Sequence, residues 1–141
     1  MIRKADKNDL ERIMEIWLET NLLSHYFIPN SYWISNYEEV KIAISQAEVY
    51  VYEIEDVICG FIGLIDSYIA GIFVEKMYQS QGIGRLLLKY IKENHSFLSL
   101  HVYEKNERAL NFYVRENFKV IAESKDMNTG EKEIEMKWSV N

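Results

Sequence analysis

Several features that assign a protein to a class at first sight are scarce or absent in this sequence. Its 141 residues include one cysteine, Cys59, so no intramolecular disulfide can form. Cys59 lies in an apolar run, where a thiol behaves as a small, inert hydrophobe. No apolar run approaches the ~18–20 residues that span a bilayer, and no apolar segment of a signal peptide follows Met1. We therefore expect a cytoplasmic protein without a membrane partner.

Basic residues are also in the minority. Sixteen Lys and Arg against 22 Asp and Glu give a formal net charge of −6. This balance argues against a nucleic-acid partner, which would require a basic patch. It is compatible with a cationic ligand, although an acidic surface also serves solubility. The three histidines and one cysteine lack the spacing of metal ligands, so no metal site is expected.

Apolar residues make up 48% of the chain, which suits one packed domain over residues 1–141. Changes in apolar periodicity predict its elements. They are a strand at 2–5, a helix from about residue 10 with Asp6 as its N-cap, a helix from Ser31 to Gln46, strands at 49–54, 57–65 and 69–74, a helix at 81–94, a strand at 97–103, a helix at 106–117, and strands at 119–123 and 133–138. This order indicates the α/β class, with helices packed on a mixed sheet.

The segment between the strand at 69–74 and the following helix has the composition of an anion site. The first amides of a helix have no partner within it, and the helix dipole makes its N-terminus positive. Gly82 and Gly84 let the backbone approach an anion, and Arg85 adds a charged, forked donor. A pyrophosphate fits such a site. The alternative is that the glycines only allow close packing of helix on sheet. The glycine patterns of P-loops and dinucleotide-binding folds are absent.

Two separated motifs, in this order, resemble those of the GNAT (GCN5-related N-acetyltransferase) superfamily. The first has the form Q/R-x-x-G-x-G/A and is matched by residues 79–84. It follows a strand in which Gly71 indicates a bulge or a close backbone approach. The second is an asparagine with a tyrosine seven residues later, matched by Asn106 and Tyr113.

The resemblance covers the whole chain and implies both a fold and a reaction. The implied fold is a central mixed, mostly antiparallel sheet of about seven strands with a splayed parallel pair, flanked by four helices. The implied activity transfers an acetyl group from the co-substrate acetyl-CoA to a primary amine by direct attack in a ternary complex. Further similarity to short bacterial protein-lysine acetyltransferases of this family, at 1–3, 15–19, 25–28, 32–33 and 102–106, favours a protein lysine. A small-molecule amine is an alternative, and so is a non-catalytic acyl-CoA sensor.

The resemblance also assigns residues to the two substrates. The acetyl-CoA set consists of the backbone of Ile72, Phe73 and Val74, the pyrophosphate-binding residues Gln79, Ser80, Gln81, Gly82, Ile83, Gly84 and Arg85, and Asn106. The acceptor set consists of His25, Phe27, Tyr32 and Tyr68. The alternative for the aromatic residues of the 24–33 loop is anchoring in the core, and N-capping alone would explain Asn106.

Tyr113 is the expected general acid, because a phenol of pKa ~10 can protonate a thiolate of pKa ~8.5. The alternative is an aromatic residue of the core. A lysine amine must lose a proton before it attacks, and the strand at 68–74 lacks the glutamate that many family members use. Candidates for the base are Asp66, His101, Glu104 and His25. A water-mediated route without a single base is also open, and no feature sets the oligomeric state.

Overall fold

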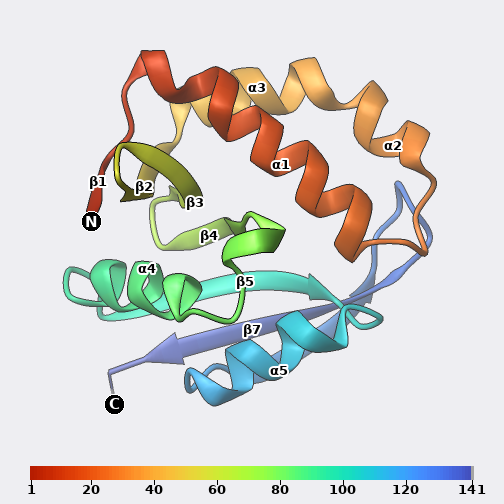
Figure 1. The fold of residues 1–141 in the computed structure, drawn as a ribbon. Coiled ribbons are helices and arrows are strands. Elements are labelled where there is room, and N and C mark those ends of the chain that lie inside the picture. Colours follow the sequence, from red (N-terminus) through yellow and green to blue (C-terminus); the bar gives the residue numbers. More distant parts are fainter. Residues whose placement is uncertain (141) are drawn as a thin grey trace.

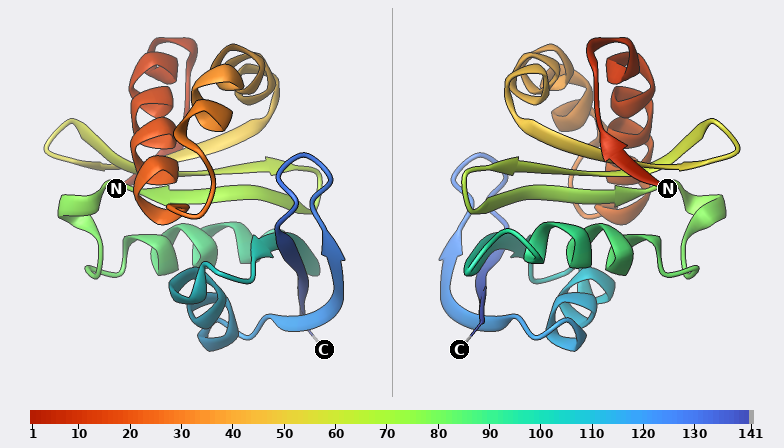
Figure 2. Two further views of the ribbon diagram at one scale, coloured as in Figure 1. Left: turned by 90° about the vertical axis from the view of Figure 1, so that its right-hand side faces the viewer. Right: turned by 90° about the vertical axis from the view of Figure 1, so that its left-hand side faces the viewer.

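The computed structural model describes residues 1–140 as a seven-stranded mixed sheet with helices on both of its faces (Figures 1 and 2). The strands are β1 (Ile2–Lys4), β2 (Glu48–Ile54), β3 (Val57–Ile65), β4 (Tyr68–Val74), β5 (Phe97–Tyr103), β6 (Lys119–Lys125) and β7 (Lys132–Ser139). The α-helices are α1 (Leu10–Ser24), α2 (Asn30–Ser35), α3 (Tyr37–Gln46), α4 (Ile83–Lys92) and α5 (Glu107–Arg115), with short 3-10 turns η1 (Lys7–Asp9) and η2 (Lys76–Tyr78). The strand order is β1-β2-β3-β4-β5-β7-β6.

The predicted fold class and the order of elements are confirmed, with one correction to the number of helices. The helix expected from Ser31 to Gln46 is two helices, so five α-helices rather than four lie within residues 1–140. The break falls at Asn36, whose φ of −94° and ψ of 0° do not continue a helix. Its side-chain amide donates to the carbonyl of Tyr32 at 2.6 Å and competes with the helical hydrogen bond there. Asp6 forms the predicted capping box, but it begins η1 rather than α1 itself.

Two apolar cores lie on opposite faces of the sheet. Helices α1, α2 and α3 cover one face, and α4 and α5 cover the other (Figure 2). Alternation along β3 sends Phe61 to the α1 side and Ile62 to the α4 side. Cys59 is fully buried in the α4-side core, and burial raises the pKa of its thiol. Within residues 1–140, every helix is too short or too polar to cross a bilayer.

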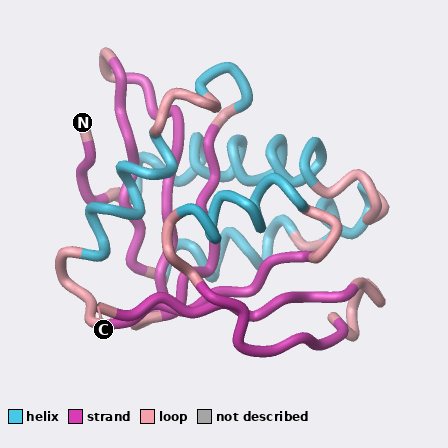
Figure 3. Tube along the Cα trace, turned by 90° about the horizontal axis from the view of Figure 1, so that it is seen from below, coloured by secondary structure: helices cyan, strands magenta, loops and turns pink. Residues whose placement is uncertain are grey.

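The sheet opens at its centre, between β4 and β5. These two strands form the one parallel pair among the described strands, and Tyr68 with Ser99 is their only paired position. The strands on either side of this point run in different directions (Figure 3). On its other edge β4 carries the expected bulge, since Gly63 pairs with Gly71 and Leu64 with Ile69, which leaves Ala70 unpaired. Beyond Tyr68 the β5-facing edge of β4 is therefore free of sheet partners and borders a gap in the sheet.

Candidate active site

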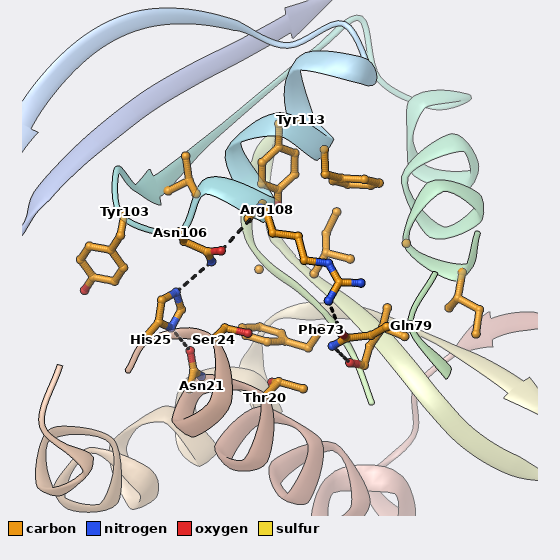
Figure 4. Close-up of a pocket in the computed structure, with 18 of the residues that line it drawn as sticks. Thr20, Asn21, Ser24, His25, Phe73, Gln79, Tyr103, Asn106, Arg108 and Tyr113 are labelled. Carbon is orange, nitrogen blue, oxygen red and sulfur yellow. Dashed lines mark hydrogen bonds between the residues drawn. The ribbon is translucent and has the colours of Figure 1, made fainter. Parts of the chain in front are cut away.

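A cavity of about 650 Å³ occupies the place where β4 and β5 separate (Figure 4). Its walls come mainly from α1, β4, β5, α4, α5 and the loop that joins β4 to α4, and Trp33 of α2 and Glu133 of β7 complete them. The β4 residues expected to contact acetyl-CoA, Ile72, Phe73 and Val74, all line it. A strand edge without a neighbour can form main-chain hydrogen bonds with an extended ligand, as an added strand would.

The junction of residues 79–85, which we call the anion junction, lies at one end of this cavity. Its conformation depends on Gly82, whose φ of +82° lies in the left-handed region that favours glycine. Helix α4 begins at Ile83, and no described side chain caps it. Its first internal bond runs from the Leu86 amide to the Gly82 carbonyl at 3.0 Å, which leaves the amides of residues 83–85 available to an anion.

Most of the predicted residues of the anion junction line the cavity. These are Gln79, Ser80, Gly82, Ile83, Gly84 and Arg85. Gln81 is the exception, because its exposed side-chain amide donates to the Met77 carbonyl at 3.4 Å instead. A Cβ added at Gly84 would meet Phe112 at 3.5 Å, an ordinary contact distance. Close helix packing therefore does not by itself require a glycine at this position.

Arg108 on α5 holds the anion junction from the opposite wall. Its guanidinium donates to Gln79 Oε1 at 2.7 Å and to Ser80 Oγ at 3.0 Å, and Gln79 Nε2 donates to the carbonyl of Val74 at 2.8 Å (Figure 4). One arginine thus links α5, the loop and the end of β4. Arg85 and Arg115 line the same cavity. The three guanidinium groups and the free helix amides suit a diphosphate.

Tyr113 points from α5 into the cavity (Figure 4). The residue is 8% exposed, and its ring packs edge-on against Phe112 and Phe118 with centroid distances of 5.3 and 5.6 Å. No group within residues 1–140 hydrogen-bonds its hydroxyl. Burial, and to a lesser extent the nearby Tyr68, raises the pKa of Tyr113, so the phenol keeps its proton at neutral pH. Tyr113 is thus a core aromatic that also presents an unpartnered proton donor to the cavity.

His25 is held at both ring nitrogens. Its Nδ1 lies 2.9 Å from Asn21 Oδ1, and its Nε2 lies 3.2 Å from Asn106 Nδ2 (Figure 4). Asn21 Nδ2 donates to the Trp17 carbonyl, and Asn106 Oδ1 accepts from the Ala109 amide while capping α5. These bonds fix both amide orientations, so Nδ1 of His25 carries the proton and Nε2 accepts.

The same arrangement keeps His25 neutral. Its ring stacks on Trp33 at 5.2 Å, and burial lowers its pKa to about 4. With no free lone pair and no tendency to protonate, His25 is poorly suited to act as the base, although it lines the cavity. Phe27 and Tyr32 do not line this cavity. Both are half-buried and pack against the α1-side core, and Tyr32 also lines a second pocket.

A cluster of polar side chains lies where β4 and β5 are closest. Tyr68 Oη and His101 Nδ1 are 2.8 Å apart, and Glu133 on β7 lines the cavity beside them. We call these three residues the Tyr68 cluster. The other two candidates for the base lie outside the cavity, since Asp66 occupies the β3–β4 turn with a φ of +55° and Glu104 pairs with Lys132.

Three functional candidates emerge only from the three-dimensional arrangement: Arg108, Asn21 and Glu133. Arg108 bonds Gln79 and Ser80, Asn21 bonds His25, and Glu133 lines the cavity close enough to Tyr68 to raise its pKa further than burial alone. Arg108 could have been suspected, because it lies inside the motif from Asn106 to Tyr113. No signal in the sequence marks Glu133. No group of three or more His, Cys, Asp or Glu side chains within residues 1–140 could hold a metal ion.

Comparisons with known proteins agree with this geometry. The family profile described as an acetyltransferase (GNAT) domain matches residues 45–120. The chain is 34% identical over 123 residues to the peptidyl-lysine N-acetyltransferase YiaC of Escherichia coli strain K12, covering 86% of this chain and 84% of YiaC.

Two solved structures share the fold. The apo-form of YjaB from Escherichia coli has a TM-score of 0.87 at 24% identity, covering 98% of this chain and 96% of that chain. YncA from Salmonella typhimurium, determined with its cofactor acetyl-CoA, has a TM-score of 0.71 at 18% identity, covering 100% of this chain and 94% of that chain. The chain belongs to the GNAT family and is an acetyl-CoA-dependent N-acetyltransferase.

Proposed function

We propose that this enzyme acetylates the ε-amine of a protein lysine by direct attack in a ternary complex. The observation that carries the proposal is one cavity that joins an anion junction, a buried phenol and a carboxylate-containing cluster. The similarity to a peptidyl-lysine N-acetyltransferase over most of the chain supports the choice of acceptor.

The chain's own groups fit acetyl-CoA at both ends of the cavity. The free edge of β4 at Ile72, Phe73 and Val74 would bond the pantetheine arm, and the amides of residues 83–85 would bind the pyrophosphate. Arg108 would hold the junction in place through Gln79 and Ser80. When bound, acetyl-CoA supplies an acetyl group activated as a thioester.

Tyr113 would donate the proton that the departing sulfur needs. Its hydroxyl is unpartnered in the described structure and faces the cavity, so no internal bond has to break first. Its raised pKa keeps the proton in place until thiolate develops nearby. Asn106 caps α5 and contacts His25, and so helps to fix the helix that carries Tyr113.

The end of the cavity at the Tyr68 cluster suits a cationic acceptor. Glu133 and Glu135 lie on the β7 face that adjoins Tyr68 and His101. Burial raises the pKa of Tyr68, and the two carboxylates raise it further. This negative charge would attract the ammonium group of a lysine and disfavour an anionic acceptor.

A free-thiol release assay with acetyl-CoA tests the proposal. The acceptors are lysine peptides, peptides with a free N-terminal amine only, and small amines such as a polyamine. We expect turnover with lysine peptides and little with the others. Turnover confined to small amines would replace the proposed acceptor. Acetyl-CoA binding without turnover on any acceptor would instead indicate a sensor.

A further inference from the structure

An acetyltransferase acting on lysine must hold an ammonium ion and remove a proton from it. The sequence offers four candidates for the base, and the structure argues against three of them. Asp66 and Glu104 lie outside the cavity, and His25 has both nitrogens occupied. His101 remains, but its Nδ1 is engaged by Tyr68.

We propose that Glu133 is a catalytic residue, the carboxylate that binds the acceptor's ammonium group and accepts its proton. This inference rests on the proposed function, lysine acetylation. The inference goes beyond that function by assigning the base to β7, a strand on which the sequence gives no indication of a base.

The position of Glu133 in the sheet supports the assignment. Glu133 pairs with Tyr103 of β5, and the next residue on the same face, Glu135, pairs with His101. Directly opposed residues of antiparallel strands share a face, so Glu133 lies on the side of the sheet that carries His101. Two carboxylates line the cavity, Glu116 and Glu133. Glu116 lies 3.9 Å from Arg85, next to the anion junction. Glu133 is therefore the cavity carboxylate available to a cation at the Tyr68 cluster.

The cations near Glu133 are already paired with other carboxylates. Lys132 bonds Glu104 and Glu123, and Lys105 bonds Glu131. No described Lys or Arg forms an ion pair with Glu133. A half-buried carboxylate that lacks a cation gains much from binding one.

The groups that face Glu133 also favour proton transfer. They are His101 and Tyr103 on β5, Tyr68 on β4, Tyr32 on α2, Glu135 on β7 and Asp126 before β7. Burial and Asp126 raise the pKa of Glu133, while His101 opposes them. The carboxylate is thus a stronger base than an exposed glutamate. Tyr113 is 8% exposed, lines the same cavity and has no partner for its hydroxyl within residues 1–140, which independently indicates that a ligand atom belongs there.

The protons balance as follows. One N–H bond of the ammonium breaks and its proton passes to a carboxylate oxygen of Glu133, which later releases it to solvent. The freed lone pair forms the C–N bond as the C–S bond breaks, and sulfur takes the proton of Tyr113. The second proton lost by nitrogen restores the Tyr113 phenol. The sum is ammonium plus acetyl thioester giving amide, thiol and one proton.

The test compares two acceptor peptides that differ in one atom. One contains lysine, and the other contains an aminooxy analogue whose nitrogen is uncharged at neutral pH and needs no base. Glu133→Gln keeps the size of the side chain and removes its charge. Glu123→Gln makes the same charge change on β6, outside the cavity, at a carboxylate that pairs with Lys132. Unfolding midpoints and acetyl-CoA affinity of both variants show whether they fold and load normally.

We expect Glu133→Gln to lower kcat/KM for the lysine peptide by about 10²- to 10⁴-fold, the usual contribution of a general base. With the aminooxy peptide Glu133→Gln should change kcat/KM by no more than about 3-fold, and Glu123→Gln should have a small effect on both peptides. Equal losses on the two peptides, or full activity of Glu133→Gln on lysine, would overturn the assignment. Wild-type enzyme that turns over neither peptide would instead refute the proposed function.

Discussion

The contacts that hold His25 at both ring nitrogens lead to a quantitative prediction of how stability depends on pH. The folded state holds His25 neutral between Asn21 and Asn106, and its pKa falls from 6.5 to about 4 because the ring is buried. In the unfolded chain the same ring protonates near pH ~6.5. The stabilisation associated with neutral His25 is therefore complete above this pH and is lost as the pH falls from about 6.5 to about 4.

The magnitude follows from the two pKa values. A difference of about 2.5 in pKa corresponds to about 3 kcal/mol in the limit, of which about 2.5 kcal/mol should be lost between pH ~7.5 and pH ~4.5. The perturbation is His25→Gln, which retains hydrogen-bonding groups and cannot titrate in this range. The assay is urea unfolding at both pH values, for which 141 residues give a steep transition.

The wild type should lose about 2.5 kcal/mol more than the variant on acidification. Subtracting the variant's loss of unfolding free energy from that of the wild type removes the contributions of carboxylates such as Asp9 and Asp126, whose lowered pKa values also cost stability in acid. Identical losses for the two proteins would show that His25 titrates normally in the folded state, and the clamped arrangement would be refuted.

Three other substitutions test the site. Arg108→Ala should weaken acetyl-CoA binding by about 10-fold, since the anion junction loses two charged donors. Arg108→Lys should give an intermediate Kd by calorimetry. An unchanged Kd in both variants would contradict the claim that Arg108 holds the anion junction in place. Gly82→Ala should lower the free energy of unfolding by about 1 kcal/mol because of its φ of +82°. Gly63→Ala is the matched control, because a Cβ there would meet nothing nearer than 3.9 Å; equal costs would argue against a special conformation at Gly82. Asn106→Asp keeps the α5 cap but sets a carboxylate beside His25 Nε2, so the pKa of His25 measured by NMR should rise by about 1 or more. No rise would place the two groups further apart than described.

The sequence predicted best what depends on local periodicity and on glycine. The α4 pattern and the residues of the anion junction lie together in the chain, so their geometry follows from a strand, a turn and a helix start. The bulge beside Gly71 and the separated β4–β5 pair also agree with prediction. The split between α2 and α3 was missed, because it depends on one Asn36 side chain that competes for a backbone carbonyl.

The contacts across the cavity could not be predicted in this way. Asn106 reaches His25 over 81 residues of sequence, and Arg108 reaches Gln79 over 29. Glu133 joins the cavity only because β7 pairs with β5 ahead of β6 in the sheet. Phe27 and Tyr32 stay predictions for the acceptor side, since both rings lie outside the cavity walls and pack half-buried against the α1-side core.

The central claim is that Tyr113 acts as an acid in a cavity that also binds acetyl-CoA. It is tested most directly by thiol release from acetyl-CoA with a lysine peptide, for wild type and Tyr113→Phe, alongside acetyl-CoA affinity by calorimetry. The phenylalanine ring keeps the contacts with Phe112 and Phe118 and removes only the hydroxyl. We predict that kcat falls by about 10²-fold or more while the Kd for acetyl-CoA changes by less than about 2-fold. Equal turnover in the two proteins would contradict the account.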